Sequence, residues 1–142
     1  MIVVFDASTF VSAALKENSL PEQALLRTVS TPNRLLFSQA IEDEYREVIF
    51  RPKFDRFVAA ERRQRILGIV IVAAERVEPV EAVRECRDLK DDKYLALAAA
   101  GKADVIVSSD LRIARRSGWE CASIRMVSAT ALMAEIVAVD CD

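Results

Sequence analysis

Short apolar runs alternate along the chain with longer segments in which apolar residues recur every three or four positions. The short runs are typical of buried strands, and the longer segments are typical of helices with one apolar face. Because strands and helices alternate, the pattern predicts an α/β fold with a mainly parallel central sheet and helices on both faces. The predicted strands are residues 2–5, 34–37, 105–107 and 124–127, and residues 77–80 are predicted as a short strand or an extended piece.

Capping residues and prolines mark the ends of the predicted helices. The apolar run around residues 69–72 falls inside a long helix that spans roughly residues 59–74. Gly101 stands where a helix commonly ends on a C-cap glycine. The helix starts are marked by Ser8 or Thr9, by Pro21, by Ser38 and by Ser128.

Two of the predicted strands are followed closely by an aspartate. Asp6 comes directly after the strand at residues 2–5, and Asp110 follows the strand at residues 105–107. Open α/β folds bind ligands at the carboxyl edge of the sheet, so these two carboxylates could share one site. The competing interpretation is that each aspartate only caps the helix that follows its strand.

Two further helices carry acidic residues beside their apolar faces. In the helix after Ser38, Glu44 lies on one flank of the apolar stripe and Glu42 on the other, and periodicity does not choose between them. Asp91 projects on the same side of its helix as Tyr94, toward the packed face. A solvated acidic face, or capping of the helix start, is the alternative for these residues.

Composition removes several classes of chemistry. The 142 residues include no histidine, which excludes Ser-His-Asp and Cys-His nucleophilic sites and histidine-ligated metals. The first turn, Asp6 to Thr9, lacks the glycines of a dinucleotide-binding fold. Carboxylates gathered without histidine repel one another unless a cation neutralises them. Oxygen-only ligands suit Mg²⁺ or Mn²⁺, so the implied reaction is metal-assisted hydrolysis of a phosphodiester.

Length and apolar content indicate one compact domain over residues 1–142, since 52% of the residues are hydrophobic. No apolar stretch approaches the about 18–20 residues that a membrane-spanning helix needs. We expect no signal peptide, three reduced cysteine thiols and a cytoplasmic location.

In their order along the chain, these segments resemble the PIN domain family, and the resemblance covers nearly the whole sequence. The segments that carry it are residues 2–6, 44–54, 88–95 and 103–110. The resemblance selects Glu44 over Glu42. It implies an endoribonuclease with four catalytic carboxylates, three of which hold Mg²⁺ or Mn²⁺. The catalytic set is Asp6, Glu44, Asp91 and Asp110, and the metal ligands are Asp6, Asp91 and Asp110.

The resemblance extends to a PIN subgroup often described as VapC-type toxins. It therefore implies an RNA substrate, an antitoxin protein that occupies the acidic cleft, and a homodimer. Two positions depart from the family pattern: Ser8 stands where an asparagine is common, and Arg112 where a further acid is common. Arg112 favours the alternative of a catalytically silent PIN-like module that binds RNA or a protein partner.

Basic residues near the acids could hold RNA phosphates, with a solvated helix face as the alternative for each. Ser8, Arg46, Arg112 and Arg115 are the predicted substrate-binding residues, and Arg51, Lys53, Arg56 and Arg116 lie nearby. Arg62, Arg63 and Arg65 are expected at the surface. For Phe54, Phe57 and Trp119, core packing is favoured over stacking on bases or contact with a partner.

Overall fold

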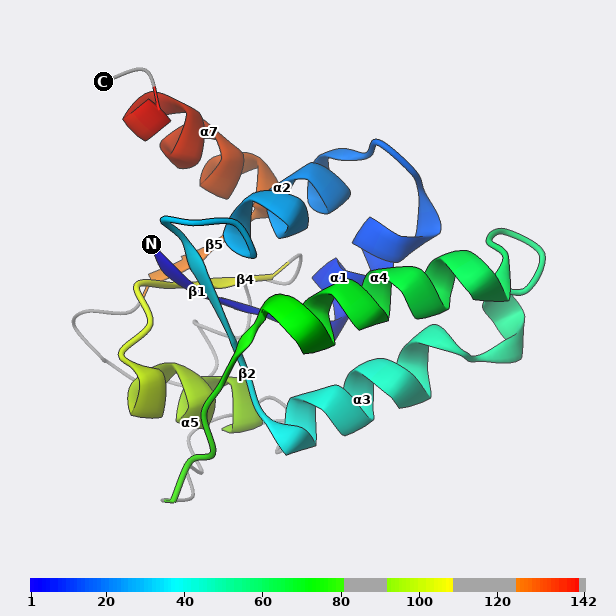
Figure 1. The fold of residues 1–142 in the computed structure, drawn as a ribbon, viewed down its shortest axis with the longest axis horizontal. Coiled ribbons are helices and arrows are strands. Elements are labelled where there is room, and N and C mark those ends of the chain that lie inside the picture. Colours follow the sequence, from blue (N-terminus) through cyan, green and yellow to red (C-terminus); the bar gives the residue numbers. More distant parts are fainter. Residues whose placement is uncertain (81–91, 109–124, 141–142) are drawn as a thin grey trace.

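The computed structural model describes residues 1–80, 92–108 and 125–140 and places a five-stranded sheet at its centre (Figure 1). The strand order is β3-β2-β1-β4-β5, and every neighbouring pair is parallel. This confirms the predicted α/β class. The described elements are β1 (Ile2–Phe5), α1 (Ala7–Leu15), α2 (Leu20–Thr28), β2 (Arg34–Phe37), α3 (Gln39–Ile49), the 3₁₀ helix η1 (Pro52–Phe54), α4 (Ala60–Ala73), β3 (Glu75–Arg76), α5 (Asp92–Gly101), β4 (Val105–Val107), β5 (Arg125–Val127) and α7 (Ala129–Asp140).

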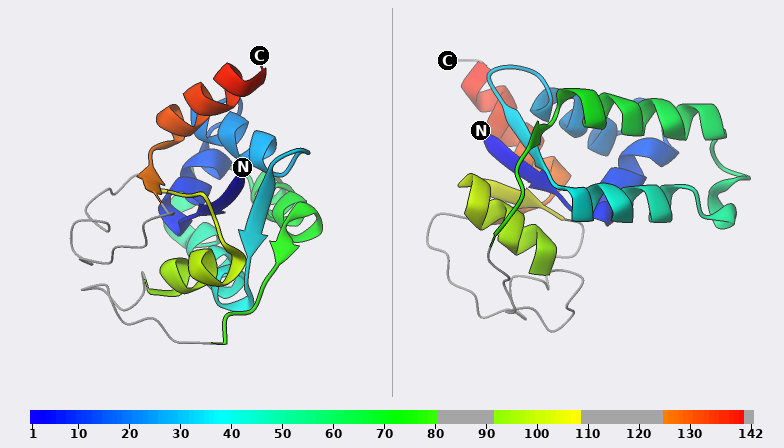
Figure 2. Two further views of the ribbon diagram at one scale, coloured as in Figure 1. Left: turned by 90° about the vertical axis from the view of Figure 1, so that its left-hand side faces the viewer. Right: turned by 60° about the horizontal axis from the view of Figure 1, so that its bottom comes forward.

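Helices cover both faces of the sheet. Helix α5 packs against β1, β2 and β4 on one face, while α1, α2 and α7 contact one another in series on the other (Figure 2). Helices α3 and α4 form a hairpin that contacts α1 and extends away from α5 (Figure 1). Within the described ranges, no helix is long and apolar enough to cross a membrane.

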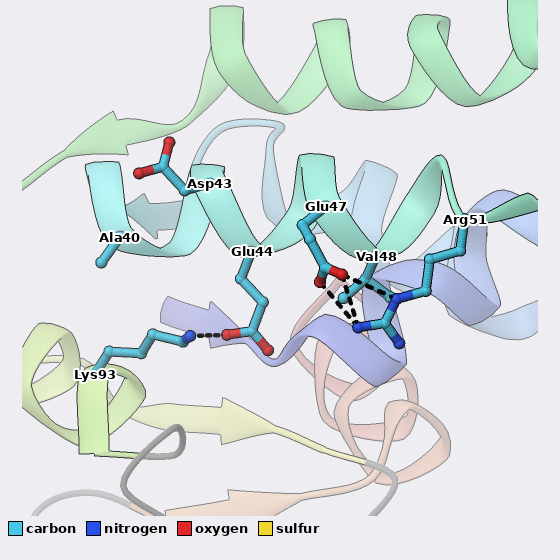
Figure 3. Close-up of a pocket in the computed structure, with 7 residues that line it drawn as sticks. All are labelled: Ala40, Asp43, Glu44, Glu47, Val48, Arg51 and Lys93. Atoms are coloured by element: carbon cyan, nitrogen blue, oxygen red, sulfur yellow. Dashed lines mark hydrogen bonds and ion pairs between the residues drawn. The ribbon is translucent and has the colours of Figure 1, made fainter.

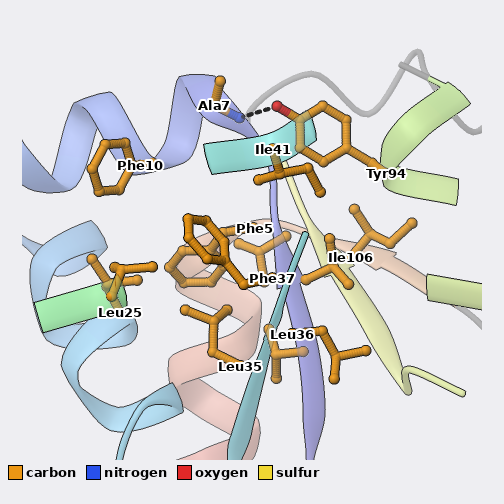
Figure 4. Packing of buried hydrophobic residues seen from close by; sticks show 14 of the residues in the cluster. Phe5, Ala7, Phe10, Leu25, Leu35, Leu36, Phe37, Ile41, Tyr94 and Ile106 are labelled. Carbon is orange, nitrogen blue, oxygen red and sulfur yellow. Dashed lines mark hydrogen bonds between the residues drawn. The ribbon is translucent and has the colours of Figure 1, made fainter. Parts of the chain in front are cut away.

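The core lies between the sheet and these helices, where β1 and its neighbours contribute near-continuous apolar runs (Figure 4). Val3 and Val4 of β1 are fully buried, as are Val105 and Val107 of β4. Strands that are buried on both faces need apolar residues at successive positions, because both sides of the pleat meet packed helices. The centre of the sheet is therefore a rigid support for the residues that follow β1 and β4.

A serine side chain caps the N-terminus of each of three helices. Ser19 caps α2, Ser38 caps α3 and Ser128 accepts a hydrogen bond from the N–H of Ala131 at the start of α7. Each hydroxyl satisfies a backbone donor that has no partner inside its helix. The predicted caps at Ser38 and Ser128 are thus confirmed.

Three predicted boundaries are wrong. The first helix begins at Ala7 with Asp6 as its N-cap, rather than with Ser8 or Thr9. Of the two alternatives for residues 77–80, the strand is wrong, because the chain pairs with β2 two residues earlier, as β3. Gly101 is the last residue of α5, and the left-handed residue that follows is Lys102, with φ 54°.

The expectation of surface positions for Arg62 and Arg63 is also wrong. Arg62 donates to the carbonyls of Ala13 and Ala14 and pairs with the buried Glu22, so it ties α4 to the end of α1. Arg63 is buried and donates to the carbonyl of Ile49. Both guanidinium groups bind the free carbonyls of a helix C-terminus, where a positive charge is stabilised.

Candidate functional site

Asp6 lies at the carboxyl edge of the sheet, directly after β1. Its backbone N–H donates to the carbonyl of Val107, the last residue of β4, over 3.0 Å. The strand order reverses its direction between β1 and β4, which is the usual ligand position in open parallel sheets. Asp6 is therefore at the predicted edge.

Side-chain and backbone donors hold the Asp6 carboxylate in one orientation. The N–H of Thr9 donates to Oδ1 over 2.8 Å, and the Ser8 hydroxyl lies 3.0 Å from both oxygens. Ser108, the residue after β4, donates to Oδ2 over 2.5 Å. The Asp6 residue is only 5% exposed. Asp6 is thus a helix cap, as the competing interpretation held, and also a fixed carboxylate at the sheet edge.

Two buried tyrosines bind the backbone on either side of Asp6. Tyr45 of α3 donates its hydroxyl hydrogen to the carbonyl of Phe5 over 2.5 Å. Tyr94 of α5 accepts a hydrogen bond from the N–H of Ala7 over 3.0 Å (Figure 4). Helices α3 and α5 are therefore both fixed to the single peptide segment that carries Asp6.

Glu44 and Lys93 immediately precede these tyrosines and form an ion pair with each other (Figure 3). Their side chains are 21% and 25% exposed, so the pair is largely withdrawn from solvent. Glu44 extends from α3 and Lys93 reaches toward it from α5 (Figure 3). The tyrosine contacts thus bring a second carboxylate and an ammonium group to the same edge of the sheet.

A groove of about 400 Å³ runs beside this ion pair (Figure 3). At one end lie Glu44 and Lys93, and at the other end lies Arg51, which forms a bidentate pair with Glu47. Its walls thus carry both acidic and basic groups. The lining residues are Ala40, Asp43, Glu44, Glu47, Val48, Arg51 and Lys93.

The tyrosines report the electrostatic field of the two carboxylates. Burial raises the pKa of Tyr45 well above its usual value, and the negative charges of Asp6 and Glu44 raise it further. The pKa of Tyr94 is raised by burial first and also by Tyr45, Glu44 and Asp6. Both carboxylates therefore act on the same pair of phenols, which stay neutral and hydrogen-bonded.

The two flanks of α3 have different partners. Glu42 pairs with Arg76 over 2.9 Å and lies 3.8 Å from Arg46, whereas Glu44 faces Lys93. Arg46 is thus drawn toward Glu42, away from the groove at Glu44. Of the two glutamates that periodicity left open, Glu44 is the one beside the groove.

Half of the predicted site residues lie within the described chain. The structure brings Asp6 and Ser8 together, places Glu44 beside the same edge, and turns Arg46 elsewhere. Across residues 1–80, 92–108 and 125–140, no group of three or more acidic or thiol ligands gathers in a way that could hold a metal ion. The predicted residues outside the described chain are Asp91, Asp110, Arg112 and Arg115.

Sequence reasoning missed the groups that assemble the site. Lys93 carried a signal, because it stands two residues after Asp91 and one before Tyr94, but it was not considered as a partner for Glu44. Ser108 follows a strand and could have been predicted at the same edge as Asp6. The tyrosine contacts carried no sequence signal, since an inward tyrosine is ordinarily predicted as core.

Comparison with known proteins agrees with this geometry. A model of the PIN domain matches residues 2–112. The fold is similar to a chain of VapBC2 from Rickettsia felis bound to a DNA fragment from their promoter, with a TM-score of 0.58, 14% identity, and coverage of 90% of this chain and 98% of that chain. A search of the curated proteins finds no match. Since the PIN model matches most of the sequence, including both described carboxylates, the chain belongs to the PIN domain family.

Proposed function

We propose that this protein is an endoribonuclease that hydrolyses RNA phosphodiester bonds with the help of Mg²⁺ or Mn²⁺. The observation that carries the proposal is the arrangement around Asp6. Its carboxylate is held after β1 by three donors, namely the Ser8 and Ser108 hydroxyls and the N–H of Thr9, and the Tyr45 hydrogen bond to Phe5 fixes α3, which carries Glu44, to the same segment. Family membership supports the same reaction class.

The described residues fit a hard cation. Asp6 and Glu44 offer only oxygen donors, which suit Mg²⁺ and Mn²⁺. Glu44 already attracts one cation, the ammonium group of Lys93. We propose Asp6, Asp91 and Asp110 as the metal ligands, with Glu44 as the fourth catalytic carboxylate. A bound Mg²⁺ would lower the pKa of its water and stabilise the charge of the attacking and leaving oxygens.

The chain's own residues would position and polarise the substrate. The hydroxyls of Ser8 and Ser108 orient the Asp6 carboxylate, and Ser8 is exposed enough to meet a phosphate oxygen as well. Glu44 can accept a proton from water, and Lys93 can move from Glu44 to a phosphate oxygen as the substrate enters. Arg112 and Arg115 remain proposed phosphate contacts.

We also propose a protein partner and a second copy of the chain. The similar fold of a VapBC2 chain favours an antitoxin that covers the groove beside Glu44 and blocks the substrate. The PIN resemblance favours a homodimer. Elution volume and light scattering of the pure protein, alone and with a coexpressed neighbouring protein, test both proposals.

Metal-dependent cleavage of RNA tests the main proposal. We expect cleavage of labelled single-stranded RNA with Mg²⁺ or Mn²⁺, and loss of cleavage with EDTA, with Asp6→Asn and with Asp91→Asn. Lys102→Gln is the control, because Lys102 is exposed and lies at the far end of α5 from Lys93. Cleavage that survives both EDTA and the aspartate variants would exclude this mechanism.

The alternative is a catalytically silent module that binds RNA. Two features favour it: the ammonium of Lys93 already neutralises Glu44, and Arg112 stands close to Asp110 in the sequence. It predicts RNA binding without Mn²⁺ binding in a titration of the pure protein. Stoichiometric Mn²⁺ binding that is lost in Asp6→Asn would favour the nuclease.

A further inference from the structure

The segment between α3 and α4 forms an exposed tip on the helical hairpin. This tip, residues 50–58, lies at the end of the hairpin away from α5 (Figures 1 and 2). It is an ordered segment: the N–H of Phe54 donates to Arg51, and the N–H groups of Phe57 and Val58 both donate to Phe54. Val58 is buried and anchors the end of the tip. A surface on the tip is therefore formed before any ligand arrives.

Two cations of the tip lie over aromatic rings. The Nζ of Lys53 is 5.1 Å from the ring centroid of Phe54, and the Cζ of Arg56 is 5.9 Å from that of Phe57. Within the described chain, neither cation forms an ion pair with a carboxylate. Their charge is therefore available to an anionic ligand.

The single acidic residue of the tip is already neutralised. Asp55 accepts a hydrogen bond over 2.9 Å from Arg63, whose side chain is only 4% exposed. The same guanidinium group donates to the carbonyl of Ile49, which holds it in place. Lys53 and Arg56 thus leave the tip with a net positive surface.

Phe57 is exposed to a degree that core packing cannot explain. Its residue is 66% exposed, although core packing was the favoured expectation for it. It lines a groove of about 620 Å³ together with Pro52, Lys53, Asp55 and Arg56. An exposed ring flanked by cations in a groove is the combination by which proteins bind single-stranded nucleic acids, with bases stacked on the ring and phosphates near the charges.

The tip groove begins where the groove beside Glu44 ends. Arg51 closes the groove at Glu44, and the next residue, Pro52, lines the tip groove. The seven steps from Glu44 to Arg51 follow α3 to just past its end at Ile49 and cover about 10 Å at the rise of a helix, a distance of one or two nucleotides. Arg51 is paired with Glu47 only at the exposed surface, so this weak pair can open to admit a phosphate.

We propose that the α3–α4 tip is a binding subsite for single-stranded nucleic acid, in which one base stacks on Phe57 and neighbouring phosphates contact Lys53 and Arg56. This proposal rests on the proposed nuclease function. It adds that the RNA strand runs from Glu44 along α3 to the tip. It would hold the part of the strand that flanks the cleaved bond. Free cations beside an exposed ring favour this ligand over a neutral protein surface.

Binding without cleavage tests the subsite directly. A fluorescein-labelled single-stranded oligoribonucleotide of about a dozen nucleotides is titrated by anisotropy in EDTA. We expect Phe57→Ala to weaken binding about five-fold to a hundred-fold, Phe57→Leu to weaken it less, and Phe57→Trp to preserve or tighten it. Only stacking predicts that order for the three side chains.

Salt dependence tests the phosphate contacts. The double variant Lys53→Gln, Arg56→Gln should reduce the slope of log K against log salt by about 1.4, or ~0.7 for each cation. Lys102→Gln removes another exposed lysine, outside the tip, and should leave affinity and slope unchanged. Thermal unfolding confirms that each variant is folded.

Three outcomes overturn the subsite. Equal binding by wild-type and tip variants excludes it but leaves the nuclease proposal intact if the wild type still cleaves RNA. Absence of single-strand binding by the wild type excludes it as well, and the cleavage assay then decides separately on the nuclease. A Phe57→Ala variant that binds RNA normally but changes from dimer to monomer assigns the tip to contact between two copies.

Discussion

The hydroxyl of Tyr94 lies 3.0 Å from the backbone nitrogen of Ala7 and accepts its hydrogen bond in the core. Replacing Tyr94 by Phe leaves that buried N–H without a partner, at a cost of about 1–3 kcal/mol. We therefore expect a lower free energy of unfolding in urea for Tyr94→Phe. Ser12→Ala, which removes an exposed hydroxyl that bonds within α1, should change stability by less than ~0.5 kcal/mol and is the control.

Ionisation of the two buried tyrosines limits the stability of the fold at alkaline pH. Tyr45 and Tyr94 are the chain's two tyrosines, and burial raises the pKa of both well above the usual 10.0. Below pH 10.0 folded and unfolded chains both keep these protons, but above it only the folded chain does. Stability should therefore fall as pH rises past this value, and tyrosinate absorbance should appear together with unfolding. Tyrosinate formed in a fully folded chain would contradict this expectation.

The buried pair of Glu22 and Arg62 limits the stability of the fold at acid pH. Burial raises the pKa of Glu22, but hydrogen bonds from Arg62 and the N–H of Asn18, together with nearby positive charges, lower it below its usual 4.5. Stability from this group is therefore present above pH 4.5 and is lost as pH falls through the lowered value.

The variant Arg62→Met should reveal how much the Glu22–Arg62 pair contributes to stability. It leaves Glu22 buried without its cation, at a cost of about 3–5 kcal/mol at neutral pH. The difference in Tm between the variant and the wild type should shrink below pH 4.5, where Glu22 becomes protonated. Lys102→Met, which removes an exposed cation that does not act on the pKa of Glu22, is the control.

Replacing glycine by alanine is expected to have opposite effects on the free energy of unfolding at Gly101 and at Gly68. A Cβ atom at Gly101 would overlap Cδ1 of the buried Leu36, whereas no atom lies within 4 Å of a Cβ built at Gly68. Gly101→Ala should lower the free energy of unfolding by about 1–3 kcal/mol. Gly68→Ala, inside α4, should raise it by up to ~1 kcal/mol, because alanine favours the helix. Equal effects at both positions would contradict the close approach of α5 to β2.

Lys93 offsets the negative charge of Glu44 and so weakens the attraction of the proposed site for a metal ion. Lys93→Gln removes the ammonium group from the ion pair and leaves the carboxylate more negative. Because a partly exposed ion pair contributes up to about 1 kcal/mol, Mn²⁺ should bind up to about five-fold more tightly. Calorimetric titration measures this affinity, with Lys102→Gln as the control. Weaker Mn²⁺ binding in Lys93→Gln would assign Lys93 a supporting role instead.

The parts of the fold that were predictable are those that depend on local pattern. Alternating apolar runs and periodic helices were sufficient for the parallel sheet, and Ser38 was recognised as a cap because its hydroxyl acts on the adjacent turn. Strand β3 was misplaced because two exposed residues, Glu75 and Arg76, form it. No apolar pattern marks such a strand, and only its pairing with β2 defines it.

The acidic residues of the candidate site were predictable, but the residues that hold them in position were not. Asp6 could be recognised because it directly follows an apolar run. The same location, between a strand and a helix, makes it both a helix cap and a carboxylate at the sheet edge. The partners of Arg62 and Arg63 lie on other helices, so helix periodicity could not distinguish them from the exposed Arg65. Gly101 was predicted as a C-cap glycine, whereas its real constraint is the space left by Leu36.

The tyrosine contacts determine how cleanly the chemistry at Asp6 can be tested. Tyr45 and Tyr94 bind peptide groups of Phe5 and Ala7, and neither hydrogen bond uses the side chain between them. Asparagine at position 6 can keep the cap to Thr9 while its charge is lost. The two helices then stay anchored, so a change in activity at this position reports the missing charge rather than a displaced scaffold.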